Sequence, residues 1–387
     1  MRLDLWVFAV SLILLTACGP APVHFLREGS EASRLAQVRE RVTLVPLWAY
    51  DANRPYEEFT GHLTPALGQD WLFVAERSGR VSALDPESGD WQWQVEIGEL
   101  LTAGVGLGEK LVLVATDAGE IVALDRADGK TVWTRAVGGR VSVAPIVAGN
   151  LVVVRSGSNQ VIALMERSGE IKWQFQKNTP SFSVRGVSAP LVIDQVVVAG
   201  FSDGNLVGID LERGTELWNL IVARSQGDNE ISRLIDIDAN PVVIDELLIV
   251  AAYQDGVSAY GLRDLSKVWE VELSVLKNIA VSGAGLFLTD DEGVVNGLNL
   301  DNGELGWRQA ALRGRGVSAP VPLNNRLVLV GDYQGFLHLL DIETGEIMGR
   351  SSIHGGAILA LIAQKEDRVF VVSESGNVSA WALGVRD

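Results

Sequence analysis

The stretch Gly79-Arg-Val-Ser-Ala-Leu-Asp-Pro-Glu-Ser-Gly-Asp-Trp-Gln-Trp93 is followed, forty residues later, by Gly119-Glu-Ile-Val-Ala-Leu-Asp-Arg-Ala-Asp-Gly-Lys-Thr-Val-Trp133. Both stretches obey the pattern G-x-V/I-x-A-L-D-x-x-x-G-x-x-x-W. A period of about forty residues is typical of folds built from repeated small β-sheets. This repeat therefore decides the fold class of the chain.

The pattern occurs eight times between residue 79 and the end of the chain. The copies begin at positions 79, 119, 159, 204, 255, 293, 335 and 376, which are 40, 40, 45, 51, 38, 42 and 41 residues apart. The copy from Asp255 to Trp269 is degraded, and Gly349 replaces the tryptophan of the seventh copy. The eighth copy starts at Gly376 and ends with the chain before its tryptophan.

Each copy reads as four short antiparallel strands. The alternation in Val81-Ser-Ala-Leu84 predicts a strand, and Asp85-x-x-x-Gly89 predicts a hairpin loop, because Asp bonds nearby backbone and Gly tolerates positive φ. The next strand carries Trp93, whose large apolar ring suits packing between neighbouring units. Prolines occupy matching places at the start of the expected inner strands, where a missing ladder donor is tolerated: Pro65, Pro145, Pro190, Pro241 and Pro320.

Repeats of four short strands build a β-propeller. The eighth repeat lacks its outer strand, and Val42-Thr-Leu-Val-Pro-Leu-Trp48 upstream of the first inner strand supplies one together with the missing tryptophan. We therefore predict an all-β, eight-bladed β-propeller over residues 41–387, with the last blade closed by the N-terminal strand. An open stack of β units is the alternative, and the complementary partial ends favour closure.

The N-terminus has the features of a secreted lipoprotein. Leu5–Thr16 is an apolar run of twelve residues, which is short for a membrane span but suits a signal peptide over residues 1–17. Leu15-Thr-Ala-Cys18 resembles a bacterial lipobox, so acylation at Cys18 is expected; a signal peptide with a coincidental Cys is the alternative. Residues 18–40 are then a lipidated flexible tether. In lipoproteins of enteric-type bacteria an Asp after the cysteine signals retention in the inner membrane, so Gly19 at this position favours the outer membrane.

Composition excludes several classes of protein. The chain of 387 residues has 32 Lys and Arg against 49 Asp and Glu, a net charge of −17, which disfavours nucleic-acid binding. A hydrophobic content of 47% excludes a disordered chain. A single cysteine excludes an intramolecular disulfide and cysteine-based metal clusters, and four scattered histidines show no ligand spacing. We expect neither a metal nor a cofactor.

Two repeats are longer than the others because of insertions after Trp173 and Trp218. The inserted stretches are 177–186 and 224–238, in two consecutive connections between blades. Equivalent connections emerge on one face of a propeller, so the two insertions should be neighbours, and loops on a rigid scaffold often carry binding function. The alternative is a self-satisfied pair of loops, in which Arg185 and Arg233 bond Asp236 and Asp238.

The Trp-ended repeat resembles the pyrroloquinoline-quinone-type propeller. A lipobox followed by eight such repeats resembles the BamB family, lipoprotein subunits of the outer-membrane β-barrel assembly machinery. The segments 181–190, Ser-Phe-Ser-Val-Arg-Gly-Val-Ser-Ala-Pro, and 233–242, Arg-Leu-Ile-Asp-Ile-Asp-Ala-Asn-Pro-Val, match two motifs of that family. The likeness covers nearly the whole chain, and the two loop motifs are more specific than the repeat.

The resemblance implies a non-catalytic subunit of the Bam complex at the periplasmic face of the outer membrane. In the family these loops dock on the POTRA domains of BamA. The partner-binding residues carried over by position are Phe182, Val184, Arg185, Asp236 and Asp238. Phe182 and Val184 stand where leucines are usual. Other Bam subunits and unfolded barrel precursors, which could pair with exposed strand edges, are the further partners that the resemblance implies.

Two other functions share the fold. A quinoprotein dehydrogenase needs a quinone and Ca²⁺ in the central channel. Many such enzymes also stack the quinone on a disulfide of adjacent cysteines, which this chain cannot form. The glycine-rich stretch Gly104–Gly108 occupies an inner-strand position and lacks the lysine and helix of a phosphate loop, so we interpret it as structural. An envelope propeller that senses small ligands is the third possibility.

Overall fold

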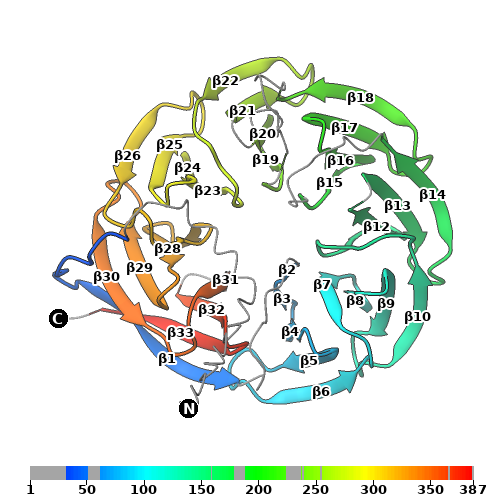
Figure 1. Ribbon diagram of the computed structural model, residues 1–387, viewed down its shortest axis with the longest axis horizontal. Coiled ribbons are helices and arrows are strands. Elements are labelled where there is room, and N and C mark those ends of the chain that lie inside the picture. The colour runs from blue at the N-terminus through cyan, green and yellow to red at the C-terminus, as the bar shows by residue number, and fades with distance from the viewer. Residues whose placement is uncertain are drawn as a thin grey trace, which may run out of the picture.

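The computed structural model describes residues 32–50, 62–157, 159–177, 188–223, 237, 239–252, 255–364 and 367–385. Within these ranges the regular structure consists of 33 strands, arranged in eight sheets around a ring (Figure 1). The predicted all-β, eight-bladed propeller is therefore confirmed. Among the described residues, no helix has the length and apolar character needed to cross a membrane.

From the inner to the outer strand, blade 1 contains β3 (Ala66–Leu67), β4 (Leu72–Ala75), β5 (Arg80–Leu84) and β6 (Trp91–Glu96). Blade 2 contains β7 (Leu101–Leu107), β8 (Leu111–Thr116), β9 (Glu120–Asp125) and β10 (Thr131–Ala136). Blade 3 contains β11 (Ile146–Ala148), β12 (Leu151–Ser156), β13 (Gln160–Met165) and β14 (Ile171–Gln176). Blade 4 contains β15 (Leu191–Ile193), β16 (Val196–Gly200), β17 (Asn205–Asp210) and β18 (Glu216–Ile221).

Blade 5 contains β19 (Val242–Ile244), β20 (Leu247–Ala252), β21 (Gly256–Gly261) and β22 (Lys267–Val271). Blade 6 contains β23 (Ala280–Ser282), β24 (Gly285–Thr289), β25 (Val295–Asn299) and β26 (Leu305–Gln309). Blade 7 contains β27 (Val321–Leu323), β28 (Leu327–Gly331), β29 (Phe336–Asp341) and β30 (Ile347–Ser352). Blade 8 contains β31 (Ile358–Gln364), β32 (Arg368–Ser373), β33 (Val378–Val385) and β1 (Val42–Tyr50).

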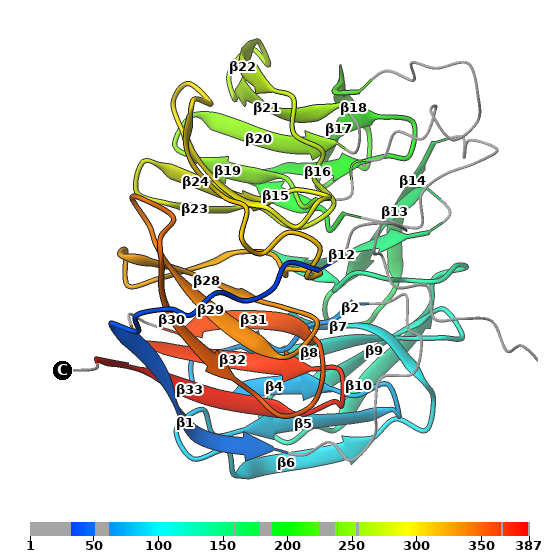
Figure 2. The ribbon, with the colours of Figure 1, turned by 60° about the vertical axis from the view of Figure 1, so that its left-hand side comes forward.

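The ring is closed by the first strand of the chain. β1 pairs antiparallel with β33 along its whole length and thereby becomes the outer strand of blade 8. Figure 2 shows β1 on the outside of β33, beside β30 of blade 7. Trp48 stands on this strand, opposite Ala380. The prediction that the N-terminal strand completes the last blade is confirmed.

Blade 2 departs from the four-strand rule. β2 (His62–Leu63) adds a fifth strand, which pairs parallel with β7 on the channel side. The sequence pattern does not predict this strand, because it lies outside the repeat. The glycines of β7 allow close approach of the backbone: a Cβ at Gly106 would lie 2.2 Å from the carbonyl oxygen of Pro145. The predicted inner-strand position of this glycine-rich stretch is therefore confirmed for Gly104 and Gly106, which lie on β7.

The hydrophobic core lies between adjacent blades. One cluster of buried side chains combines Ile121 and Trp133 of blade 2 with Val152 and Ile162 of blade 3, and similar clusters follow around the ring. The second and third strands of each blade are almost fully buried because both of their faces pack against neighbours. Each blade thus depends on the next for its stability.

The repeated tryptophan joins each blade to the next. The indole Nε1 of Trp93 donates to the carbonyl of Arg126 at 3.0 Å, and a Cβ at Gly129 would lie 2.6 Å from the indole ring. The same hydrogen bond and glycine contact recur at Trp48, Trp133, Trp173, Trp269 and Trp307. The glycines of the Asp-x-x-x-Gly loops are therefore needed both for positive φ and for space.

Two junctions between blades differ from this pattern. Blade 5 has Leu265, with φ +56°, at the place of the hairpin glycine that would receive Trp218. Blade 7 has Gly349 in place of a tryptophan, and a Cβ at this glycine would lie 2.0 Å from the carbonyl oxygen of Val42. The missing tryptophan of blade 7 thus makes room for the start of β1.

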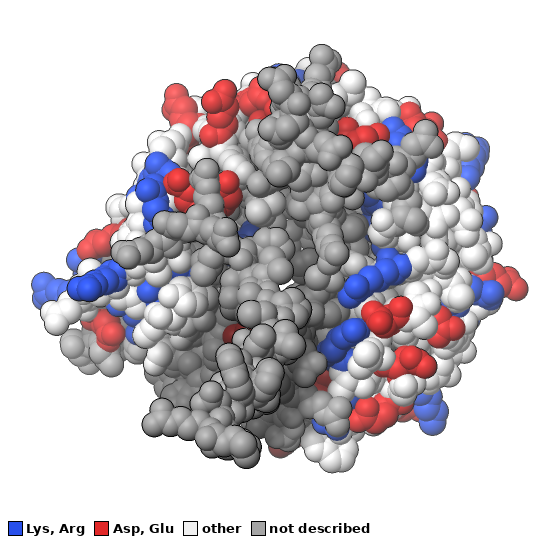
Figure 3. All heavy atoms as spheres, in the orientation of Figure 1, with Lys and Arg blue, Asp and Glu red and all other residues white. Residues whose placement is uncertain are grey.

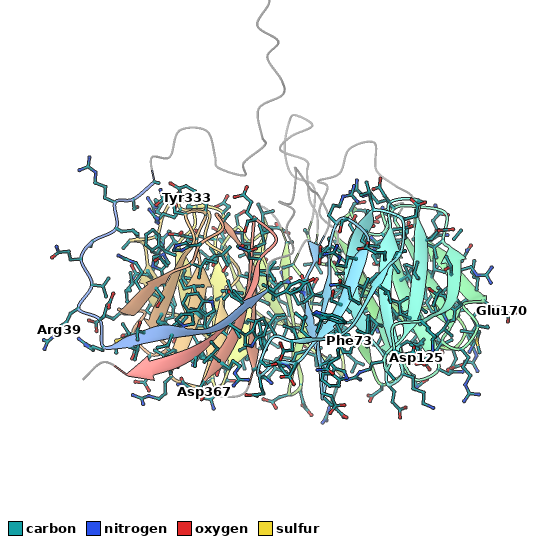
Figure 4. All side chains as sticks on the ribbon, turned by 90° about the horizontal axis from the view of Figure 1, so that it is seen from below. Arg39, Phe73, Asp125, Glu170, Tyr333 and Asp367 are labelled. Atoms are coloured by element: carbon teal, nitrogen blue, oxygen red, sulfur yellow. The ribbon has the colours of Figure 1, made fainter. Side chains whose placement is uncertain are left out.

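The ring has two distinct faces. Tyr333, in the turn between the second and third strands of blade 7, lies on one face, whereas Asp125 and Asp367 lie toward the other (Figure 4). We call the first the upper face. Because neighbouring strands are antiparallel, the connections from each outer strand to the next blade lie on the upper face too. Lys and Arg side chains are interspersed with Asp and Glu around the rim seen in Figure 3.

Candidate partner-binding face

The partner-binding residues predicted from the sequence lie outside the described residues. These are Phe182, Val184, Arg185, Asp236 and Asp238, and the same holds for Cys18. The structure describes the frame from which the two insertions arise, namely Lys177 and Ser188 around the first and Ala223, Ile237 and Ala239 around the second. This frame fixes where both insertions begin and end.

The outgoing stems of both insertions are fixed by backbone hydrogen bonds to the neighbouring turn of their own blade. The amide of Lys177 donates to the carbonyl of Asn159 at 3.1 Å. The amides of Val222 and Ala223 both donate to the carbonyl of Gly204, at 3.0 and 3.2 Å. Each insertion therefore leaves the upper face from a rigid position.

The returning stems meet each other. The amide of Ala189, after the first insertion, donates to Oδ1 of Asn240, after the second, at 2.7 Å. Both stems also converge on Gly200 at the end of β16: a Cβ there would lie 2.8 Å from Cβ of Ile237 and 2.9 Å from Oγ of Ser188. The expectation that the two insertions are neighbours is therefore met by their stems.

The buried guanidinium of Arg155 is hydrogen-bonded to this frame. Arg155 at the end of β12 is 3% exposed, and its Nη2 donates to the carbonyl of Gly200 at 2.9 Å. Its guanidinium carbon lies 4.5 Å from the ring centroid of Phe201, and Nζ of Lys177 lies 5.9 Å from the same centroid. Sequence reasoning missed this cluster. The signal was an arginine directly after the apolar run 151–154, where a buried cation needs carbonyl and aromatic partners.

The connection into blade 4 has a sequence twin in blade 7. Residues 185–190 and 315–320 are both Arg-Gly-Val-Ser-Ala-Pro. In blade 7, Arg315 is buried in an ion pair with Asp332 at 2.7 Å, and its Nη2 also donates to Gln334 Oε1 at 2.6 Å. Phe201 occupies the place of Asp332 in blade 4, three residues before the glycine that opens the third strand. The sequence of blade 4 thus offers Arg185 no carboxylate at that position.

The two insertions also place opposite charges at matching positions. Arg185 stands five residues before Pro190, and Asp236 stands five residues before Pro241. These prolines precede β15 and β19, the inner strands of neighbouring blades. A positive and a negative side chain are therefore assigned to equivalent positions of adjacent connections.

Blade 7 contains a buried Asp–His pair that could be mistaken for catalytic machinery. Nε2 of His338 lies 3.0 Å from Oδ2 of Asp332, and Arg350 Nε donates to Nδ1 of the same ring at 3.3 Å. Both ring nitrogens are thus engaged, and both side chains are fully buried. Such a pair holds the fold together and presents no reactive atom to solvent.

The ionisation of this pair follows from its surroundings. Burial lowers the pKa of His338 below its ordinary value, although the hydrogen bond with Asp332 opposes this shift. For Asp332, burial alone would raise the pKa, but hydrogen bonds from His338, the Phe336 amide and Arg315 outweigh it and hold the pKa below its ordinary value. Among the described residues, no cluster of three His, Cys, Asp or Glu side chains could hold a metal ion.

The eight-bladed ring is shared with quinoprotein enzymes. The crystal structure of quinohemoprotein alcohol dehydrogenase from Comamonas testosteroni matches with a TM-score of 0.72 at 12% identity, over 90% of this chain and 77% of that chain. At this level of identity the likeness concerns the fold alone.

Proteins with higher sequence identity to this chain are named BamB. The crystal structure of BamB from Moraxella catarrhalis matches with a TM-score of 0.81 and 27% identity, over 88% of this chain and all of that chain. The outer membrane protein assembly factor BamB of Alkalilimnicola ehrlichii is 41% identical over 97% of this chain and 96% of its own length. The family model described as outer membrane protein assembly factor BamB matches residues 29–100, 77–298 and 291–387. The chain therefore belongs to the BamB family of outer membrane protein assembly factors.

Proposed function

We propose that this chain is a non-catalytic scaffold subunit of the Bam complex, anchored by lipid on Cys18 to the periplasmic face of the outer membrane. It binds the POTRA domains of BamA through the two insertions. The residues that make this contact are Phe182, Val184, Arg185, Asp236 and Asp238. The observation that carries the proposal is the joining of both returning stems at Gly200 and through the Ala189–Asn240 hydrogen bond.

A rigid frame favours docking because less conformational freedom is lost when a partner binds. Four anchored stems hold the ends of both insertions on one face of the ring, which supports the proposal that the insertions act as one surface. Arg185 and Asp236 stand at equivalent positions of neighbouring connections, so the surface combines both signs of charge. Arg315, the equivalent arginine in blade 7, forms an ion pair with Asp332, whereas Phe201 replaces that carboxylate in blade 4. This difference supports a partner-directed role for Arg185.

The outer strands support the proposal that unfolded barrel precursors pair with the ring. Each outer strand has one edge that faces away from its blade, and apolar side chains are exposed there: Trp91 is 65%, Val132 47% and Ile171 42% exposed. The chain itself shows how an extended segment meets such an edge, since the Arg41 amide donates to the carbonyl of Met348 on β30 at 2.8 Å.

Retention of BamA tests the proposed binding site. The lipidated protein is purified from envelopes, and the BamA that co-purifies is compared between wild type, Arg185→Ala and Asp236→Ala. Loss of a central charged contact costs about 2 kcal/mol, so retention should fall roughly thirtyfold in each variant. Arg213→Ala is the matched control, because Arg213 is 80% exposed on a loop of the opposite face.

Two results would contradict the proposal. Retention of BamA at the wild-type level by both variants would remove the assigned site. Absence of BamA from the wild-type preparation would remove the scaffold function itself. The non-catalytic part has a separate test, since a titration with quinone and Ca²⁺ that produced alcohol or sugar oxidation would replace it with the dehydrogenase function.

A further inference from the structure

The segment that precedes β1 lies on blade 7 and contacts residues that are 282 positions away in the sequence. The amide of Ser33 donates to the carbonyl of Arg313 at 3.1 Å, and Nη1 of Arg315 donates to the carbonyl of Ser33 at 3.1 Å. Both backbone groups of one residue are thus bonded to the connection between blades 6 and 7. One of these bonds joins two main chains and the other comes from a guanidinium, so the connection satisfies both polar backbone groups of Ser33.

Further contacts follow along the segment. The side chain of Leu35 packs against a buried cluster that includes Leu312 and Val317. Nη1 of Arg350 then donates to the carbonyl of Ala36 at 3.1 Å. The segment ends where the Arg41 amide donates to the carbonyl of Met348. Arg39 between these points is directed away from the ring (Figure 4).

The two arginines that hold the segment are themselves held from behind. Arg315 is fixed by Asp332 and Gln334 in the interior of blade 7, where its side chain is 4% exposed. Arg350 is fixed by the ring of His338. The donors directed at Ser33 and Ala36 are therefore pre-positioned, and docking of the segment does not have to order them.

We propose that residues 33–36 form a latch that docks the tether of the lipid anchor on blade 7 and thereby sets how far the ring can stand from the membrane. Ser33 is fifteen residue steps from Cys18, a reach of at most about 50 Å, whereas Arg41 is twenty-three steps from Cys18, a reach of at most about 80 Å. The reach rests on lipidation of Cys18, which belongs to the proposed function; the latch contacts do not.

The latch is tested by cleavage of the purified full-length protein with trypsin after Arg39, an exposed residue between the contacts at Ala36 and Arg41. Although Arg39 itself is exposed, a protease has to hold several residues on each side of the cleaved bond, so the contacts at Ala36 and Arg41 have to break before cleavage. Ser33→Pro removes the amide donor to Arg313, and Leu35→Ser removes the apolar contact, so each should accelerate cleavage at least tenfold. Gln37→Ala is the control, because this exposed residue lies on the same segment, and its cleavage rate should match wild type.

The temperature of unfolding is measured on the same variants and should stay within about 2 °C of wild type, because the segment adds only a few contacts at the edge of blade 7 and leaves the strands of the blades unchanged. Wild-type cleavage as fast as in Ser33→Pro would overturn the latch. Reach is measured by energy transfer from a label at Asp367→Cys, on the opposite face, to acceptor lipid in vesicles of phosphatidylethanolamine and phosphatidylglycerol. Ser33→Pro should lower the transfer, and equal transfer in all variants would overturn the effect on reach. Neither assay contains BamA, so failure here leaves the BamA-retention test unaffected.

Discussion

Closure of the ring depends on the space that Gly89 leaves for Trp48. The substitution Gly89→Ala introduces a Cβ that would lie 2.6 Å from the indole of Trp48, on a residue whose φ is +78°. A left-handed conformation costs an alanine roughly 1 kcal/mol. Displacement of the indole adds about 2 kcal/mol of overpacking and of its weakened hydrogen bond to Pro86. We expect the free energy of unfolding to fall by about 3 kcal/mol.

Gly98 separates the two contributions. Its φ is +83°, and a Cβ there would meet no atom within 4 Å. Gly98→Ala should therefore show the conformational cost alone, about 1 kcal/mol. The difference of about 2 kcal/mol between the two substitutions measures the contact with Trp48.

Urea unfolding of the purified protein gives both values. A double-mutant cycle with Trp48→Ala completes the assay, because removal of the indole should reduce the cost of Gly89→Ala to that of Gly98→Ala. Equal costs for the two glycines in the wild-type background would refute the reasoning. The same conclusion would follow if the cost of Gly89→Ala did not change when Trp48 is absent.

Three further outcomes follow from the structure. Burial lowers the pKa of His338, so the folded protein binds a proton at this ring less readily than the unfolded chain does. The contribution of His338 to the free energy of unfolding is therefore complete above pH 6.5, its ordinary pKa, and falls as the pH drops below it. His338→Asn, which copies Asn296 of blade 6, should make the unfolding temperature less dependent on pH between 7.5 and 5.5. Burial lowers the pKa of Lys277 from its ordinary 10.5 to about 8. The free energy of unfolding should therefore rise by no more than about 3 kcal/mol as the pH increases from 8 to 10.5. Urea titrations of Lys277→Met should show no such rise. Gly349→Ala would place a Cβ 2.0 Å from the carbonyl oxygen of Val42 and should cost about 3 kcal/mol on unfolding; a neutral effect would show that β1 is not held against blade 7.

The number of blades and their closure were predictable because they rest on chemistry that repeats locally. Each copy has its own hairpin loop and its own tryptophan, so periodicity alone separates one sheet from the next. Trp48 can be assigned to the last blade because the final copy ends before the tryptophan of the repeat, and the structure places Trp48 on the outer strand of blade 8. Strands also begin directly after the prolines, as at Pro145 before β11.

The contacts that break the repeat could not be predicted in the same way. β2 joins blade 2 by parallel pairing with β7, and the segment around Ser33 docks on blade 7 more than 270 residues away in sequence. Within the described ranges, neither contact has a counterpart in another blade. On both docked segments the hydrogen-bonded groups are backbone amides and carbonyls, which every residue has, so the residue types of a segment do not indicate where it will bind.

The insertions show why departures from a repeat indicate function even where the pattern does not describe their conformation. Packing between blades requires only short connections, such as the four residues between β6 and β7 or the eight between β22 and β23. Extra length in a connection adds an entropy cost without adding to the core. The twin sequence Arg-Gly-Val-Ser-Ala-Pro makes the argument specific. In blade 7 its arginine is bound to Asp332 inside the blade, and in blade 4 the same position of the turn is Phe201. The arginine was retained in a blade that offers it no such carboxylate, so its partner has to be sought outside that turn. BamA is the partner that this reasoning favours for Arg185, and the retention assay decides it.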